Sequence, residues 1–579
     1  MRNLFRRGEG RHKRRTARRI TIAAVALALV GGGTLAATSF ADDSASRPEL
    51  LPPKGYTVVD TGEGEVHTNI IGGSDTSYSE APYVVQLFFD WNKTGDTYYF
   101  TCGGTLVAPN KVVTAAHCLY NGSGGRLDWA NYGAVLAGTN LLAGGPDNSK
   151  GQFIDVTRTY VREGYSDSTI NNDIAVLTLA KPASGVTTKW IEDHPVEYTT
   201  GQTAVSYGWG LTGSDESTAS LASTLQKIEL PLHPGAECKT NLDQFSPGTF
   251  QPSKMICAGQ PGTGNDATGA TVCPGDSGSP MVMNGEVIGV TSWGIGDGAT
   301  ACNYLGSYQA FTKVGYHFPY VHPKIDDNDI SRDGKADVFL RHKDGTGYYK
   351  KSTGSGLAPL TKLSGDWSRY NLVLQTDLNR DGYQDYLLRG TSTGTIYWRH
   401  RSASSSTYTD TKLFGSWGTR KYTAAPGDLT GDRYPDVVSV QSDGKMYVYP
   451  GKGNGTFDAR IYAGSGYSGY NSFRGSGDLN RDGRADILAR RSSDGAVFLL
   501  KGTGKAAAPF AARVQVRTWT DYNVLAAPGD VTGDGIADWI ARTPGGTLYL
   551  YPGTGQGTSS LFGSRIKIYT GYQNYNLWG

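Results

Sequence analysis

Short apolar segments, separated by glycine, proline and polar residues, recur along most of the chain. Typical ones are YVVQLFF (83–89), KVVTAAHC (111–118) and DIAVLTLA (173–180). Segments of this length, rich in valine, leucine and aromatic residues, predict β-strands. We therefore expect an all-β protein, and its 579 residues are enough for several domains.

The second half of the chain repeats one pattern five times. The nonapeptide DISRDGKAD begins at Asp329, and related copies begin at Asp377, Asp428, Asp478 and Asp530, at spacings of 48, 51, 50 and 52 residues. A short apolar strand follows each copy, and in most copies a tight turn and a second strand come next. A period of this size predicts the blades of a β-propeller.

The end of the repeat region predicts how this propeller closes. Copies two to five follow a strand such as YNLVLQ (370–375), whereas copy one follows HFPYVHPK (317–324). The sequence YNLW (575–578) lies where the leading strand of a sixth copy would start. A strand there can pair with blade one and leave no open sheet edge. We therefore expect five blades, closed by residues 575–578.

Each repeat also carries a loop with the pattern Asp-x-Asn/Thr/Ser-x-Asp-Gly-x-x-Asp. Oxygen-bearing side chains at positions 1, 3, 5 and 9 around a glycine form the kind of donor set that calcium prefers. A plain Asp-Gly turn is the alternative reading, and no EF-hand is implied because the glutamate at position 12 is missing. The expected calcium ligands are Asp329, Ser331, Asp333, Asp337, Asp377, Asn379, Asp381, Asp385, Asp428, Thr430, Asp432, Asp436, Asp478, Asn480, Asp482, Asp486, Asp530, Thr532, Asp534 and Asp538.

The repeats resemble the FG-GAP/VCBS repeats of integrin-type propellers. That resemblance supports the calcium loops and the propeller fold together. Arg433 stands where the other four copies have glycine, so we expect the third loop to be the weakest calcium site.

The N-terminal segment has the composition of an export signal. Residues 1–19 hold nine Lys or Arg and one acid, residues 20–30 are apolar but short for a membrane span, and small residues follow up to Ala41. This pattern predicts a signal peptide over 1–41 and a secreted protein without a membrane span after its removal. The arginine pairs leave twin-arginine export open beside ordinary secretion. Without these residues 46 basic and 52 acidic residues remain, a net charge of −6, so no basic patch indicates nucleic-acid binding.

Three motifs in the first half predict a nucleophilic enzyme. His117 lies in TAAHC, Asp173 in NNDIAVL and Ser277 in VCPGDSGSP. A serine hydroxyl becomes an effective nucleophile when a histidine removes its proton, and a carboxylate orients and stabilises that histidine. The order His, Asp, Ser in these local contexts resembles the trypsin/chymotrypsin family of serine endopeptidases.

This resemblance implies two six-stranded β-barrels and several further site residues. The backbone amides of Gly275 and Ser277 would form the oxyanion hole. Cleavage before Ile70 would release an amino group that pairs with the buried carboxylate of Asp276. The expected domains are a signal peptide (1–41), a propeptide (42–69), a trypsin-like protease domain (70–323) and the propeller (324–579).

Six cysteines in an exported protein indicate disulfides. Six cysteines allow 15 pairings, and a metal site is the alternative, although the sequence has no CxxC pair. The family resemblance implies the pairs Cys102–Cys118, Cys238–Cys257 and Cys273–Cys302.

The residues expected around the specificity pocket depart from those of trypsin. The resemblance puts Thr271 at the base of the pocket, where trypsin has aspartate, and Gln309 where trypsin usually has glycine. Neutral residues cannot pair with an arginine or lysine head, so we expect neutral side chains to be preferred over basic ones. Ser292 would lie behind the aspartate of the triad, and Trp293 and Gly294 would offer backbone to an extended substrate.

Two classes of function fit these patterns. The first is a secreted serine endopeptidase acting on proteins or peptides, without a cofactor for catalysis, whose calcium-binding propeller binds a protein or a polysaccharide. The second is an adhesion or binding protein whose protease half has become a scaffold; a structural cell-surface propeller processed by its protease is a third reading. The intact motifs of the triad favour the first, and we expect a monomer.

Overall fold

The computed structural model describes residues 48–49, 70–93, 97–121, 123–144, 150–297, 300–326, 328–331, 333, 335–400 and 407–579. The expected signal peptide and most of the expected propeptide lie outside these residues. Nearly all of the described elements are β-strands, which confirms the all-β prediction. Among them we find no helix that is long and apolar enough to cross a membrane.

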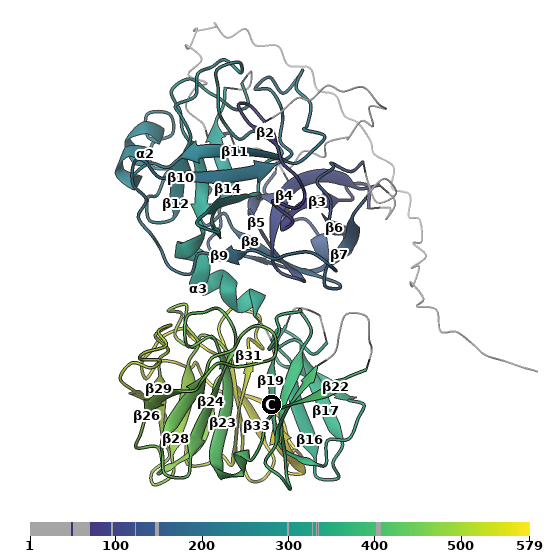
Figure 1. The fold of residues 1–579 in the computed structure, drawn as a ribbon, viewed down its shortest axis with the longest axis vertical. Coiled ribbons are helices and arrows are strands. Elements are labelled where there is room, and N and C mark those ends of the chain that lie inside the picture. The colour runs from purple at the N-terminus through teal and green to yellow at the C-terminus, as the bar shows by residue number, and fades with distance from the viewer. Residues whose placement is uncertain are drawn as a thin grey trace, which may run out of the picture. The chain divides into compact units, whose positions relative to one another are not determined.

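Six strands of the first half close into a barrel (Figure 1). Around the barrel their order is β3-β4-β5-β8-β7-β6, and β6 pairs with β3 to close it. Buried valine and leucine side chains from these strands fill the interior. The strands are β3 (Val84–Phe89), β4 (Tyr99–Ala108), β5 (Lys111–Thr114), β6 (Gly133–Ala137), β7 (Gln152–Val161) and β8 (Ala175–Leu179), with the short helices η2 (His117–Leu119) and α1 (Trp129–Tyr132) between β5 and β6.

Six further strands form the second barrel, in the order β12-β15-β14-β13-β10-β11. A single bridge between Leu232 and Ala258 joins its two ends. The strands are β10 (Thr203–Gly208), β11 (Gln226–Pro231), β12 (Met255–Ala258), β13 (Pro280–Met283), β14 (Glu286–Ile295) and β15 (Gln309–Lys313). Of the short strands, β2 (Ser74–Asp75) pairs with β11, while β1 (Pro48–Glu49) and β9 (Trp190–Ile191) pair with the two ends of β14. Helix α2 (Gly235–Leu242) precedes β12.

Three disulfides tie the loops of these barrels. They join Cys102 to Cys118, Cys238 to Cys257 and Cys273 to Cys302. These are the pairs implied by the family resemblance, and every cysteine of the chain is bonded. The Cys102–Cys118 bond holds the helical turn that carries His117 against β4.

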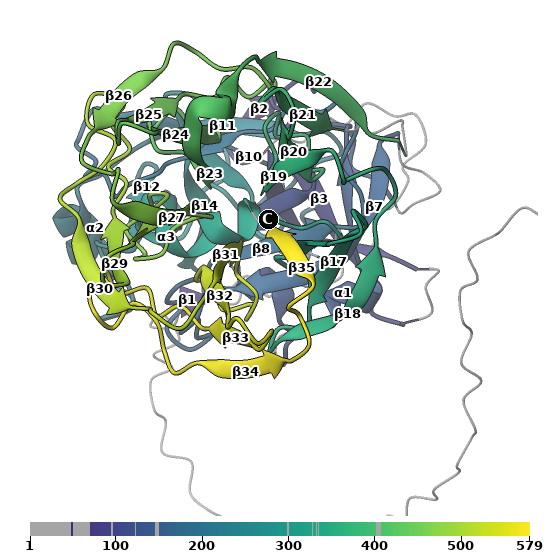
Figure 2. The ribbon, with the colours of Figure 1, turned by 90° about the horizontal axis from the view of Figure 1, so that it is seen from below.

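The second half is a propeller of five four-stranded blades (Figure 2). The strands β19, β23, β27, β31 and β35 lie innermost around the ring. In chain order the strands are β16 (Val338–His342), β17 (Gly347–Ser352), β18 (Leu357–Lys362), β19 (Tyr370–Thr376), β20 (Asp385–Gly390), β21 (Ile396–His400), β22 (Thr409–Phe414), β23 (Arg420–Gly427), β24 (Asp436–Gln441), β25 (Met446–Tyr449), β26 (Ile461–Gly464), β27 (Tyr470–Arg474), β28 (Ile487–Arg491), β29 (Ala496–Leu500), β30 (Val514–Thr518), β31 (Val524–Gly529), β32 (Asp538–Arg542), β33 (Leu548–Tyr551), β34 (Ile566–Tyr569) and β35 (Tyr575–Trp578), with the turn η4 (Trp417–Thr419) before β23.

Blade one contains strands from both ends of the propeller. Strand β35 pairs with β16, with Trp578 opposite Leu340 and Leu577 opposite Arg341. This arrangement confirms the predicted closure by residues 575–578 and removes an edge that could otherwise pair with another chain.

Arginines join neighbouring blades in a way that the sequence patterns did not reveal. Arg490 of blade four donates from Nε to the side chain of Asn471 in its own blade, over 2.8 Å, and from Nη1 to the carbonyl of Tyr522 in blade five, over 2.6 Å. Equivalent bonds extend from blades one, two and five, through Arg341, Arg389 and Arg542. In blade three the corresponding residue is Val440, which has no side-chain donor. A charged donor satisfies the turn carbonyls of the next blade at four of the five junctions.

Helix α3 (Val314–Ile325) follows the last strand of the second barrel and leads to the propeller (Figure 1). It buries Val314, Phe318 and Val321 in the same core as the first barrel. Two prolines, Pro319 and Pro323, lie inside it and remove two backbone donors. The last turn of α3 is also buried, through Lys324 and Ile325.

Candidate active site

His117 and Asp173 form a tight pair between the barrels. Asp173 precedes β8, and its Oδ2 lies 2.8 Å from Nδ1 of His117, while its Oδ1 accepts the backbone amide of His117 over 2.8 Å. Both side chains are buried, with exposures of 3% and 0%. Two bonds from one carboxylate fix both the position of the histidine and the direction of its ring.

A β-bulge brings a third residue to this pair. The register between β14 and β15 shifts between Thr291 and Trp293, so Ser292 is the extra residue of the bulge. Its hydroxyl donates to Oδ2 of Asp173 over 2.6 Å. A bulge re-aims a side chain that would otherwise lie on the other face of the sheet. The sequence placed Ser292 behind Asp173, and it lies in contact with it.

One further partner of Asp173 was not anticipated. The hydroxyl of Thr312, on β15, donates to the backbone carbonyl of Asp173 over 2.7 Å. The local sequence around Thr312 does not indicate this contact, because the contact joins residues 139 positions apart.

Ser277 lies in the turn before β13, and its backbone carbonyl accepts the amide of Gly103 on β4. Its Oγ and the Nε2 of His117 are both buried, and neither has a hydrogen-bond partner among the residues that the structure describes. Unsatisfied buried polar atoms are uncommon and call for an explanation. Catalytic hydrogen bonds in proteins without substrate are often long and tighten only when substrate binds.

The backbone beside Ser277 has donors without acceptors. Within the described part of the chain, the amides of Gly275 and Ser277 donate to no protein oxygen, although the neighbouring amide of Asp276 donates to Cys273. Gly275 has a φ of 98°, and a β-carbon there would come within 2.8 Å of Leu221. Glycine is therefore needed for both the backbone angle and the space.

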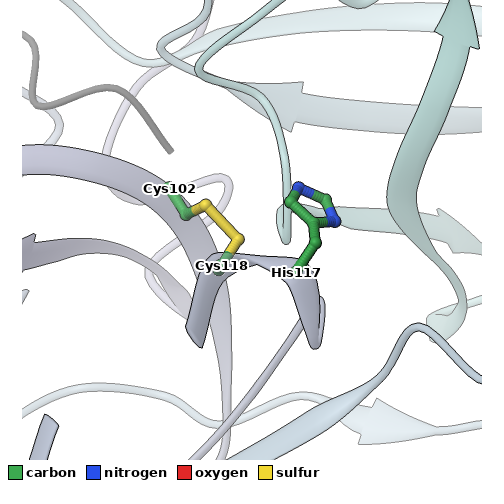
Figure 3. Close-up of side chains that lie close together, drawn as sticks. All are labelled: Cys102, His117 and Cys118. Carbon is green, nitrogen blue, oxygen red and sulfur yellow. A yellow bond between two sulfur atoms is a disulfide. The ribbon is translucent and has the colours of Figure 1, made fainter. Parts of the chain in front are cut away.

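The same neighbourhood contains three side chains of metal-binding type, Cys102, His117 and Cys118 (Figure 3). The two cysteines form a disulfide, so they have no thiolate to offer a metal. No other group of three closely spaced His, Cys, Asp or Glu ligand atoms occurs among the described residues. Two bonds with Asp173 hold the ring and the backbone amide of His117.

Comparisons with known proteins agree with this geometry. Residues 70–316 match the family model described as Trypsin, and residues 377–439, 428–489 and 478–541 match that of the FG-GAP-like repeat. A trypsin of Saccharopolyspora erythraea is 33% identical over 256 residues, which cover 44% of this chain and 98% of that protein. The chain belongs to the trypsin family. Trypsin zeta of Drosophila melanogaster is 32% identical over 260 residues (44% of this chain and 84% of that protein), and trypsin I-P1 of Gallus gallus is 31% identical over 277 residues (47% and 96%).

The trypsin domain is a serine endopeptidase domain, and it buries Asp276 completely. The two carboxylate oxygens accept the backbone amides of Gly210, over 2.7 Å, and Cys273, over 2.9 Å. Burial nevertheless raises the pKa of Asp276 to about 7. Gly208 and Gly210 enclose the carboxylate so closely that a β-carbon on either would come within 2.3 Å of one of its oxygens.

The segment expected to become the N-terminus packs beside the expected pocket. Ile70 is fully buried among core residues of the second barrel, which include Val272. The carbonyl of Ile71 accepts the amide of Thr271 over 3.0 Å. The position of Ile70–Ile71 is therefore coupled to the position of Thr271, which was expected at the base of the pocket.

Gln309 lies against Gly294 in the trypsin domain. It is the first residue of β15, paired with Ala258, and is only 5% exposed. A β-carbon added to Gly294 would lie 2.2 Å from Oε1 of Gln309. Thr271 and Trp293 are buried as well. The carboxamide of Gln309 thus occupies space next to the backbone that was expected to bind substrate.

That same backbone already pairs with another strand. β1 runs antiparallel to β14, with Glu49 opposite Gly294 and Pro48 opposite Ile295. The backbone of β14 at Gly294 therefore accepts an extended strand, here β1 of the same chain.

The repeat loops have several features in common among the residues that the structure describes. The position-1 aspartate accepts the amide of position 6 in the second to fifth loops, at Gly382, Arg433, Gly483 and Gly535. The position-9 aspartate is buried in all five loops. Burial, followed by neighbouring carboxylates, raises the pKa of Asp377 and Asp337 to about 8 and that of Asp478 to about 7. A cation placed among these carboxylates would favour their charged forms.

Arg433 does not distort the third loop. Its φ of 73° matches the 77° of Gly382 and the 86° of Gly483 at the same position. Its side chain leaves the loop and pairs with Glu286 at the start of β14. The loop keeps the backbone of the other copies, so the substitution by itself gives no reason for a weaker third loop.

Proposed function

We propose that this chain is a secreted endopeptidase in which Ser277 is the nucleophile, His117 the general base and Asp173 the residue that orients the imidazole. The observation that carries the proposal is the pair of bonds between His117 and Asp173. Because a carboxylate can only accept, it favours the proton on Nδ1 of His117. Nε2 then has the lone pair that can take the proton of Ser277.

The reaction proceeds through an acyl-enzyme. Oγ of Ser277 attacks the carbonyl carbon of the substrate while its proton moves to Nε2 of His117. The carbonyl oxygen becomes negative and accepts the free amides of Gly275 and Ser277. The C–N bond breaks as His117 gives its proton to the leaving amine, and an ester remains on Ser277. Water, deprotonated by His117, hydrolyses this ester and restores the serine hydroxyl.

The substrate is expected to bind as an extended strand along β14. Pairing of β1 with Gly294 supports this, because β-strand addition uses the same backbone groups. Thr271 offers no negative charge for an arginine or lysine, and Gln309 takes up volume beside Gly294. We expect short neutral side chains to be preferred before the scissile bond.

Activation is expected to require a cut before Ile70. In the uncut chain Asp276 is buried with a raised pKa and has only backbone donors among the described residues. A free α-amino group at Ile70 would supply the missing positive charge. Removal of residues 42–69 would also take β1 away from the edge of β14, so one cut would complete the site and free the substrate strand.

The repeat loops are expected to bind calcium. Their side chains are hard oxygen donors, and the buried, raised-pKa aspartates at positions 1 and 9 favour a bound cation. The carboxylates of each loop are not all within 4.8 Å of one another, so an ion would have to draw them closer. Calcium here would neutralise the repulsion between aspartates and fix the loop between the first two strands of the blade. It takes no part in peptide hydrolysis.

The three disulfides suit an extracellular protein, because such bonds form and persist in oxidising surroundings. The signal peptide at 1–41 is expected to deliver a monomer there, and the propeller is expected to hold a protein or polysaccharide near the protease.

A fluorophosphonate probe tests the proposed function. Protein cut before Ile70 is expected to incorporate one probe per chain, at Ser277, and to hydrolyse casein-derived peptides. The Ser277→Ala variant is the control and should do neither while keeping its three disulfides. An unlabelled, correctly folded protein would favour the adhesion alternative.

A further inference from the structure

One lysine of the trypsin domain's last helix contacts an aspartate of a repeat loop. Nζ of Lys324, in the last turn of α3, donates to Oδ2 of Asp530, which is position 1 of the fifth loop. The two side chains are 3% and 2% exposed. The ring of Tyr160 on β7 lies under the ammonium, with its centroid 4.9 Å from Nζ. A buried ion pair of this kind persists only when the partners are well aligned and hydrogen-bonded.

The carboxylate of Asp530 has no acceptor site left. Each carboxylate oxygen has two lone pairs. Oδ1 accepts the amides of Gly533 and Asp534, and Oδ2 accepts the amide of Gly535 and the ammonium of Lys324. All four lone pairs are therefore in use.

The corresponding aspartates of the second, third and fourth loops are less saturated. Asp377 accepts two donors, from Asp381 and Gly382. Asp428 accepts three, all of them backbone amides, and so does Asp478. Each of these residues keeps at least one lone pair for a metal ion. Only the fifth loop, among these four, holds a lysine.

The fifth loop is also shaped around the lysine stem. A β-carbon added to Gly535 would lie 3.1 Å from Cε of Lys324. The neighbouring loops meet the trypsin domain by other ion pairs: Arg433 reaches Glu286, and Arg484 lies 2.9 Å from Asp193. The loop face of the propeller thus contacts the trypsin domain at several points. Among these ion pairs, that of Lys324 is the one that reaches a position-1 carboxylate.

We propose that the ammonium of Lys324 takes the place of calcium in the fifth loop. This loop is then a docking site for the last turn of α3, called the socket below, and not a metal site. The inference rests on the proposed calcium binding of the other loops. It corrects the expectation that Asp530, Thr532, Asp534 and Asp538 bind calcium. A divalent ion at Asp530 would have to displace a buried ammonium and would be repelled by it at short range.

The test is the number of calcium ions bound per full-length chain, measured by elemental analysis after equilibration with calcium and removal of free ions. Lys324→Gln is expected to bind one calcium more per chain than the wild type, because Asp530 regains a lone pair and loses its cation. Lys324→Arg keeps a cation and should match the wild type. Lys351→Gln is the surface control, since the side chain of Lys351 is 40% exposed and its Nζ lies 3.9 Å from a carboxylate oxygen of Asp333 in the first loop.

The outcomes separate the two ideas. Equal calcium numbers above zero in wild type and Lys324→Gln would overturn the socket. No calcium in any variant would overturn the proposed calcium function and the inference with it. A second readout guards against misfolding: the melting temperature of Lys324→Gln in EDTA should fall by several degrees relative to wild type and recover on addition of calcium. Failure of calcium to restore it would also count against the socket.

Discussion

The hydroxyl of Ser292 and the ring nitrogen Nδ1 of His117 bind the same carboxylate oxygen, Oδ2 of Asp173, over 2.6 and 2.8 Å. One oxygen thus receives a donor from each barrel, because Ser292 comes from β14 and His117 follows β5. The pair of barrels is thereby fixed at the point where proton transfer is proposed to occur.

Ser292→Ala should lower kcat by about tenfold with little change in KM, because a hydrogen bond to a charged group contributes about 1.5–3 kcal/mol. The bond orients Asp173 and does not touch substrate. Steady-state kinetics on a peptide substrate measures the effect. Ser206→Ala is a matched control, since Ser206 is equally buried and its hydroxyl has no partner among the described residues. Equal activity of the two variants would remove the positioning role.

The uncut protein should lose stability as the pH rises. Burial raises the pKa of Asp276 to about 7, against about 3.9 in an unfolded chain, so the folded state binds the extra proton between these values. The contribution of this group is most favourable below about pH 4 and falls by about 4 kcal/mol as the pH rises through 7. Denaturant unfolding of uncut Ser277→Ala protein across this range measures the change.

Two companion samples isolate the part played by Asp276. In the uncut protein, the added substitution Asp276→Asn should remove about 4 kcal/mol from the change in unfolding free energy between about pH 4 and a pH above 7. Cutting the protein before Ile70 should do the same, because the new amino group pairs with the charged carboxylate. Identical curves for cut and uncut protein would argue against that pairing.

Cleavage should not be tryptic. The wild type should prefer short neutral side chains before the scissile bond, because Thr271 carries no charge and Gln309 occupies space beside Gly294. The double variant Thr271→Asp/Gln309→Gly should gain at least tenfold in kcat/KM for arginine substrates over the wild type. Profiling with a peptide library tests both statements. Dominant arginine or lysine cleavage by the wild type would contradict the first.

A peptide with the sequence of residues 44–55 should inhibit the cut enzyme competitively. Pro48 and Glu49 pair with the edge of β14 at which the substrate is expected to bind. The peptide and the substrate should therefore compete for the backbone of Gly294. Inhibition should raise KM and leave kcat unchanged. A scrambled peptide of the same composition controls for non-specific binding, and equal inhibition by the two would count against the shared edge.

EDTA should lower the melting temperature of the propeller without changing hydrolysis of short peptides. An ion present at about 100 times its dissociation constant stabilises by about 2.7 kcal/mol per site. Calcium has to displace protons from aspartates whose pKa is about 7 to 8, so the effect should weaken as the pH falls below 7. Calorimetry of the full chain with and without EDTA measures it. Asp482→Ala should lose part of the effect, and the exposed Asp443→Ala, outside the loops, should lose none.

Much of the fold and of the candidate site could be predicted from local patterns in the sequence. The motifs around His117 and Ser277 and the period of the Asp loops are contiguous in sequence, so they could be predicted directly. The disulfide pairs followed from resemblance and were confirmed. The hydrogen bonds of Arg490 to Asn471 and Tyr522, and the bond from Thr312 to Asp173, could not be predicted. Each of them joins residues that belong to separate segments of the chain. The bond from Lys324 to Asp530 joins residues 206 positions apart, so no repeating pattern in the sequence indicates it.

Closure of blade one also sets an order in time. Strand β16 is synthesised before four other blades, and its inner neighbour β35 only after them. Until β35 has been synthesised, the backbone groups of β16 that face it have no partner in the ring. The hydrogen bond from Arg341 to Asn576 cannot form either. The propeller can therefore become complete only after β35 has been synthesised. A chain interrupted earlier would keep an exposed strand, which proteases and other chains can recognise.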